Sequence, residues 1–150
     1  MQKSEQNFNL IDWWKKVVFE NYANFSGRAR RAEYWYFVLG QICVALPLHL
    51  ISMAGMMNGG SALSIVGFAI YGLFILGTLI PTLAVSVRRL HDTNKSGWYY
   101  FIALIPAIGS IILLVWFLTD GDRFRNNYGE DPKNVDGPSF DFEQPQTFTS

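Results

Sequence analysis

The sequence predicts an all-α membrane protein, and the main reason is a stretch of 54 residues, 34–87, that contains no Asp, Glu, Lys or Arg. A soluble domain of 150 residues cannot shield so long an uncharged stretch from water, because even core helices keep a polar face. A second uncharged run covers residues 96–119. We therefore expect one polytopic α-helical protein with three apolar membrane segments and an interfacial amphipathic helix at the amino end.

The first expected element is the amphipathic helix, which follows a polar stretch, residues 1–8, that we expect to be flexible. Apolar residues recur at helical spacing from Leu10 to Tyr22, with Lys, Asp and Glu between them. Asn9 and Asp12 predict an N-cap pair. Aromatic residues beside two lysines favour a position in the plane of the membrane interface. The alternative is a helix that packs on the protein's own loops.

Three apolar segments follow, at about Tyr34–Ala54, Ala62–Val87 and Trp98–Leu118. A helix of about 21 residues is about 32 Å long, which is close to the thickness of the bilayer hydrocarbon. The second segment is longer than it needs to be and would tilt or kink. The third contains a proline and a glycine within Ile105–Gly109, where we expect a kink. We predict three full spans; a break at this point would instead make the third segment re-entrant, since each half is too short to cross.

The basic residues predict which side of the membrane each end faces. Residues 1–33 hold six Lys or Arg against four acids, and residues 88–95 hold three against one. The positive-inside rule then places the amino terminus and the 88–95 connection in the cytoplasm, with residues 55–61 outside. Three spans would put the carboxyl end outside, whereas a re-entrant third segment would return it to the cytoplasm.

The composition changes after Leu118, where Asp, Asn, Gly and Pro replace the apolar residues. Beyond Pro132 the chain offers nothing with which to build a core. We expect residues 9–132 to form a single membrane domain and residues 133–150 to be a disordered acidic tail.

The charged residues flank the uncharged stretch and should meet at one membrane face, where a basic cluster attracts anionic lipid headgroups. Arg30 can pair with Glu33, and Arg88 with Asp92, across one helical turn. Arginine exceeds lysine in this cluster, which suits fixed bidentate contacts. The alternative is that the charges only set the topology. The residues proposed to bind headgroups or a partner are Arg28, Arg30, Arg31, Arg88, Arg89 and Lys95, supported by Glu33, His91 and Asp92.

Other residue combinations predict no further chemistry. His91 and Asp92 lack a nucleophile and an oxyanion site, so no catalytic residue is proposed. Cys43 and His49 do not share a helix face, so no metal site is expected. The chain has no phosphate-binding loop, dinucleotide fingerprint or base-stacking sheet signature, so we expect no cofactor and no nucleic-acid partner.

The two charged segments resemble a bacterial inner-membrane family, the domain of unknown function 805. One match runs over residues 25–35, and the more specific one runs over residues 88–98. An Ile-Pro-x-x-Gly break at residues 105–109 and an Asn-x-Tyr-Gly-x-Asp-Pro element at residues 126–132 follow. The resemblance covers roughly residues 12–132 and implies a multi-pass inner-membrane protein, but the family name carries no activity.

Three functions are compatible with these observations. The first is a non-enzymatic module that binds an anionic phospholipid, a membrane-protein partner or a second copy of itself through the arginine-rich cytoplasmic face. The second is an oligomeric small transporter or channel subunit, in which Gln41, His49 and the glycine-rich second segment line a path. The third is an enzyme acting on headgroup phosphates, for which His91 and Asp92 are the only candidates.

Overall fold

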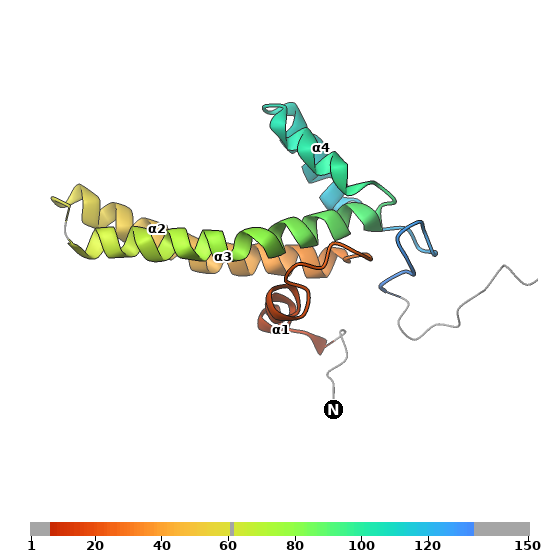
Figure 1. Cartoon of the computed structure of the whole chain (residues 1–150), viewed down its shortest axis with the longest axis horizontal. Helices are drawn as coiled ribbons and strands as arrows, with labels where there is room; N and C mark the ends of the chain where they lie inside the picture. The colour runs from red at the N-terminus through yellow and green to blue at the C-terminus, as the bar shows by residue number, and fades with distance from the viewer. Residues whose placement is uncertain (1–6, 61, 134–150) are drawn as a thin grey trace, which may run out of the picture.

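The computed structural model describes residues 7–60 and 62–133, which fold as helices joined by short connections (Figure 1). The sequence predicts a flexible end at residues 1–8 and a disordered one at residues 133–150. Most of these two ends lies outside the described residues. The elements in order are α1 (Leu10–Lys15), the π-helical turn η2 (Lys16–Glu20), α2 (Arg31–Met57), α3 (Ala62–Asp92), the 3-10 helix η3 (Gly97–Leu104) and α4 (Ile108–Leu118).

The helices α2 and α3 lie side by side as an antiparallel hairpin (Figure 1). Small residues let their backbones approach closely, as is usual for helices that pack in a membrane. A Cβ atom on Gly67 would overlap the hydroxyl of Ser52, and a Cβ atom on Gly55 would lie 2.9 Å from the Cβ of Ser64. Gly55 and Gly67 therefore serve helix packing near the far end of the hairpin.

The hairpin exposes apolar side chains to its surroundings over most of its length. Leu50, Ile51, Leu73 and Leu76 are each more than half exposed. At 27 and 31 residues, α2 and α3 are about 40 and 46 Å long, more than the roughly 30 Å of bilayer hydrocarbon. Both helices are thus long and apolar enough to cross a membrane, and their low burial distinguishes them from the core helices of a soluble protein.

The third apolar segment is not one long helix, so the predicted third span is not confirmed. It divides into η3 and α4 at Pro106 and Ala107, where proline cannot continue a helix and the alanine takes a positive φ of 62°. α4 has 11 residues and is about 16 Å long, about half of the hydrocarbon thickness. The two pieces pack so closely that a Cβ atom on Gly109 would overlap the carbonyl oxygen of Ile102. The break that the re-entrant alternative required is therefore present.

Both ends of the third segment lie at the same end of the α2–α3 hairpin. At its start, a Cβ atom on Gly97 would lie 2.7 Å from a methyl group of Val87 in α3. At its end, the indole nitrogen of Trp35 in α2 donates a hydrogen bond of 3.2 Å to the carbonyl oxygen of Phe117. In the view of Figure 1, α4 stands off the hairpin on the side opposite to α1.

The amino-terminal helix begins where the sequence predicts. The Asn9 side chain accepts a hydrogen bond from the Asp12 N–H, and the Asp12 carboxylate accepts one from the Asn9 N–H, each at 2.9 Å. This reciprocal cap satisfies backbone donors that the first helical turn leaves unpaired.

The same helix packs on α2 and also contacts the connection before it, since the Arg30 guanidinium lies 4.8 Å from the centroid of the Trp13 ring. Trp13 is buried, and a Cβ atom on Gly40 would lie 2.7 Å from the Trp14 ring. Ile11 in α1 and Phe19 in the following η2 turn remain 59% and 72% exposed. The helix therefore combines a packed aromatic face with exposed apolar side chains, which suit contact with a membrane interface.

Candidate functional site at the arginine-rich end

The two charged segments of the sequence meet at one end of the hairpin, which we call the arginine-rich end (Arg28, Arg30, Arg31, Arg88, Arg89 and Lys95). They meet because α2 begins where the antiparallel α3 finishes. The Ala29 N–H donates a hydrogen bond of 2.9 Å to the Arg88 carbonyl oxygen, and the His91 Nδ1 lies 3.1 Å from the Gly27 carbonyl oxygen. Gly27 has a φ of 79°, a conformation that favours glycine.

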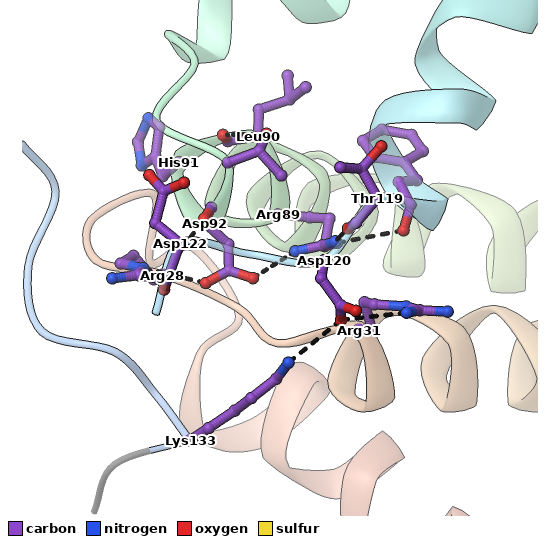
Figure 2. Close-up of polar contacts among 12 residues, drawn as sticks. Arg28, Arg31, Arg89, Leu90, His91, Asp92, Thr119, Asp120, Asp122 and Lys133 are labelled. Carbon is purple, nitrogen blue, oxygen red and sulfur yellow. Dashed lines mark hydrogen bonds and ion pairs between the residues drawn. The ribbon is translucent and has the colours of Figure 1, made fainter. Parts of the chain in front are cut away.

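Asp92 is the centre of a buried ionic cluster (Figure 2). The Arg28 Nε donates to one carboxylate oxygen at 3.0 Å, and the Arg89 Nη1 donates to the other. All three side chains are at most 1% exposed. One buried carboxylate therefore faces two buried guanidinium groups, and the remaining donors of these groups need acceptors of their own.

Backbone carbonyl groups in the last turn of α4 and after it supply those acceptors. Arg89 donates to the carbonyl oxygens of Phe117 and Thr119, and Arg28 donates to those of Asp122, Phe124 and Gly129. The Asp122 N–H in turn donates to the Asp92 carbonyl oxygen at 2.9 Å. A Cβ atom on Gly121 would overlap the Asp92 carboxylate. The buried arginines thus fasten the segment after α4 over the ends of α2 and α3.

Glu33 forms a second buried pair, next to α1. Its side chain is 1% exposed and lies 2.6 Å from the Arg88 Nη1 and 3.0 Å from the Lys16 Nζ. The sequence predicts that Arg88 pairs with Asp92, and this is wrong, because a buried carboxylate on the neighbouring helix is available to Arg88. The Arg88 Nε and Nη2 are buried without a hydrogen-bond partner among the described residues.

Arg31 differs from these buried arginines because its side chain is 43% exposed. Its Nη1 donates a hydrogen bond of 3.1 Å to Asp120, and the Lys133 Nζ lies 3.2 Å from the same carboxylate oxygen (Figure 2). The hydrogen bonds from Arg31 and then Lys133 hold the pKa of the Asp120 carboxyl below its ordinary value of 3.8. This ion pair is therefore open to solvent or to a ligand.

The other two basic residues of the arginine-rich end rest on tryptophan rings. The Arg30 guanidinium lies 4.8 Å from the centroid of the Trp13 ring, and the Lys95 Nζ lies 5.5 Å from that of the Trp116 ring. Both side chains are partly exposed. These cation–π contacts hold the charges near the surface without neutralising them.

The structure therefore divides the six basic residues predicted from the sequence into two groups. Three are buried in ion pairs: Arg28, Arg88 and Arg89. Three are partly exposed: Arg30, Arg31 and Lys95. The supporting residues Glu33, His91 and Asp92 are buried as well, and the His91 ring stacks on Tyr128 at 3.8 Å between centroids. Sequence reasoning missed Asp120 and Lys133, for which the only signal is the return of charge directly after the last apolar segment.

A groove on the first turns of α2, which we call the α2 groove, lies beside Arg31. It has a volume of about 290 Å³ and is lined by Arg31, Ala32, Trp35, Tyr36 and Leu39. Trp35 is fixed by its hydrogen bond to Phe117, and Tyr36 stacks on Trp13 of α1 with parallel rings 6.5 Å apart. The groove thus lies on α2 next to contacts made by α1 and α4.

The α2 groove contains one charged residue, and no metal-binding group accompanies it. Within residues 7–60 and 62–133, no three His, Cys, Asp or Glu side chains are placed to hold a metal ion. The chemistry available at this end is consequently that of exposed cations beside aromatic and apolar side chains. Such a surface suits an anionic group that carries an apolar part.

Two long apolar helices that expose most of their apolar side chains are typical of the class of α-helical membrane proteins. The chain belongs to the family described as "Protein of unknown function (DUF805)", whose model matches residues 22–130, and this confirms the resemblance of its two charged segments. No solved structure matches the chain.

Several relatives are known in Escherichia coli strain K12. The chain is 41% identical to the inner membrane protein YhaI over 120 residues, which cover 80% of the chain and 95% of YhaI. It is 40% identical to the inner membrane protein YhaH over 124 residues, covering 82% of the chain and 98% of YhaH. It is also 28% identical over 137 residues to the uncharacterized protein YiiR. The names of YhaI and YhaH give a location and no activity.

Proposed function

We propose that the chain is a non-enzymatic module of the bacterial inner membrane that binds anionic lipid headgroups at a cytoplasmic arginine-rich end. The observation that carries this proposal is the exposure of Arg31 beside aromatic side chains, just before the uncharged stretch of α2. Arginine binds phosphate groups well because its planar donors fit them bidentately. Trp and Tyr favour the headgroup level of a membrane.

The proposed topology has two spans, α2 and α3, with α1 and the η3–α4 hairpin inserted from one face only. The short length of α4 and the position of both ends of the third segment support it. The positive-inside rule then puts the arginine-rich end in the cytoplasm, together with the segment that follows α4. A reporter fused after Asp120 should be active in the cytoplasm, and periplasmic activity of that fusion would reject two spans.

In this proposal the buried and the exposed basic residues have different roles. Arg28 and Arg89 keep the segment after α4 in place, so they act on the binding surface only indirectly. Arg30, Arg31 and Lys95 are partly exposed and are proposed to contact the headgroups. Each cation near an anionic surface contributes about 1 kcal/mol of attraction.

The test measures which lipids the whole protein retains. Protein in mixed phosphatidylglycerol and phosphatidylcholine nanodiscs is released into detergent, and the bound lipids are counted by native mass spectrometry. The triple variant R30Q/R31Q/K95Q should lose the preference for phosphatidylglycerol. The matched control is R125Q, which removes a cation that is 72% exposed and pairs with Glu130 at 3.6 Å. An unchanged preference in the triple variant rejects headgroup binding by these residues.

The environment of His91 and Asp92 supports a non-enzymatic role. Both carboxylate oxygens of Asp92 accept hydrogen bonds from arginines. The His91 ring is stacked on Tyr128, and its Nδ1 is in hydrogen-bond contact with the Gly27 carbonyl oxygen. A general base must reach the proton that it removes, and both groups are buried by contacts with the protein itself.

One observation favours the alternative of an oligomeric transporter or channel subunit. The Gln41 Oε1 and the His49 Nδ1 on α2 are buried without a hydrogen-bond partner among the described residues. Polar atoms at membrane depth often mark a path or a contact between helices. Proteoliposomes containing the wild type and the double variant Q41L/H49F would be compared with a trapped pH-sensitive dye. Proton flux that the double variant abolishes supports this alternative, and absence of flux in the wild type counts against it.

A further inference from the structure

The geometry points to the α2 groove as the binding site of a single anionic phospholipid. Its phosphate would bind Arg31, one acyl chain would run past Trp35 and Tyr36 toward Leu39, and Asp120 would be displaced from Arg31. This inference rests on the proposed function, and it narrows a basic surface to one site with one occupant.

The lining of the groove changes from polar to apolar along α2. Arg31 at one end and Leu39 at the other are separated by about 12 Å along the helix axis. Between them lie two aromatic side chains of the kind that favours the boundary between headgroups and hydrocarbon. The polar end of the lining faces the arginine-rich end, and the apolar end faces the uncharged middle of α2. A lipid in a membrane has the same order, from its headgroup to its acyl chain.

The walls of the groove are fixed before any lipid binds. The Trp35 indole is held by the Phe117 carbonyl oxygen at 3.2 Å, and the Tyr36 ring is held by its stacking on Trp13. Because these contacts come from α4 and α1, the groove depends on the tertiary fold. A site with ordered walls loses less conformational entropy when a ligand binds.

Arg31 is the one basic residue that lines the groove, and its ion pair within the protein is an exposed one. Its guanidinium has five N–H donors, and the hydrogen bond from Nη1 to Asp120 joins two side chains that are 43% and 67% exposed. An exposed pair of this kind contributes little to stability. A phosphate group offers the same guanidinium two parallel hydrogen bonds.

The structure also shows how Asp120 can release Arg31 without losing every partner. Lys133 lies 3.2 Å from the same carboxylate oxygen, so Asp120 keeps a cation when a phosphate takes the arginine (Figure 2). Asp120 therefore acts as an internal competitor for the lipid. Neutralising it should strengthen lipid binding, which is an effect that a merely structural ion pair would not give.

The experiment uses the whole chain in mixed phosphatidylglycerol and phosphatidylcholine nanodiscs, with native mass spectrometry of the retained lipid. Retention of the last phosphatidylglycerol should fall about fivefold in R31Q, which corresponds to the loss of one cation near the surface. It should rise about two- to fivefold in D120N, where the competing pair is absent. L39W fills the apolar end and should lower retention although Arg31 is intact, whereas R125Q should leave it unchanged.

The outcomes separate this inference from the proposed function. If the wild type shows no preference for phosphatidylglycerol, both fail. If the preference persists in R31Q and L39W but disappears in an R30Q/K95Q double variant, the proposed function stands and the α2 groove is the wrong site. Inorganic phosphate that displaces the lipid, together with no effect of L39W, would make the groove a simple anion site and overturn the lipid assignment. Circular dichroism of each variant confirms that the helices are intact.

Discussion

Neutralising Asp92 tests whether the buried ionic cluster fastens the arginine-rich end. The Asp92 side chain is 1% exposed and accepts hydrogen bonds from Arg28 at 3.0 Å and from Arg89. The substitution D92N keeps the size of the side chain and removes its charge. Two buried guanidinium groups then lose their shared counterion.

The expected loss of stability follows from that environment. Removing one partner of a buried ion pair typically costs about 3–5 kcal/mol in the free energy of unfolding. Arg28 and Arg89 each keep backbone carbonyl acceptors after the substitution, so we expect about 3 kcal/mol, the lower end of that range. The exposed carboxylate of Asp120 provides the comparison, and its substitution D120N should change the unfolding free energy little.

Two measurements check this prediction on the full chain in micelles. Unfolding by increasing mole fractions of sodium dodecyl sulfate, followed by far-ultraviolet circular dichroism, compares D92N with D120N. Limited trypsin digestion at Arg123 and Arg125 reports on the segment after α4, which should be cleaved faster once its fastening is weakened. The double variant D92N/R89Q should be destabilised less than the sum of its single variants, because it removes one of the uncompensated charges.

The reasoning is refuted if D92N and D120N lower the unfolding free energy equally. It is also refuted if trypsin cleaves the segment after α4 at the wild-type rate in D92N. Either result would mean that the segment is held by contacts other than the buried arginines.

Two further predictions concern the η3–α4 hairpin and the exposed ion pair. G109A should destabilise the protein by about 1–3 kcal/mol, because its Cβ atom overlaps the backbone of η3; the control G72A meets open space and should be neutral or slightly stabilising in the same detergent titration. The pKa of the Asp120 carboxyl, measured by carbon-13 NMR, should lie below 3.8, chiefly because of Arg31 and then Lys133. The contribution of this carboxylate to stability is therefore present above the unfolded-state pKa. It is lost as the pH falls through the lowered folded-state pKa. R31Q should raise that pKa, and a titration unchanged by R31Q would show that the pair does not form.

Much of the fold could be predicted from the sequence because hydropathy and caps are local properties. The uncharged stretch predicts two long lipid-compatible helices, and the cap at Asn9 predicts where α1 begins. Pro106 predicts a kink in the third segment, whereas the structure has the break that the sequence left as the alternative. How the two pieces pack depends on Gly109 meeting η3. That contact joins residues that no local pattern relates.

The sequence also predicts that the two charged segments lie close together at one end of the fold. It does not predict which of their acids and arginines form ion pairs. The antiparallel hairpin brings residues before α2 next to the last turn of α3, as the topology requires. Which acid pairs with which arginine depends on the faces that neighbouring helices present to each other, so Arg88 pairs with Glu33 and not with Asp92.

The amino-acid order by itself determined that this chain is helical, that its middle belongs in lipid and that its basic residues collect at one end. These properties follow from the transfer of side chains between water and hydrocarbon, which depends on composition along the chain. Only the tertiary structure decided which arginines are buried and that Arg31 stays accessible beside a groove. Burial and ion pairing depend on distances between segments far apart in sequence, and packing alone fixes those distances.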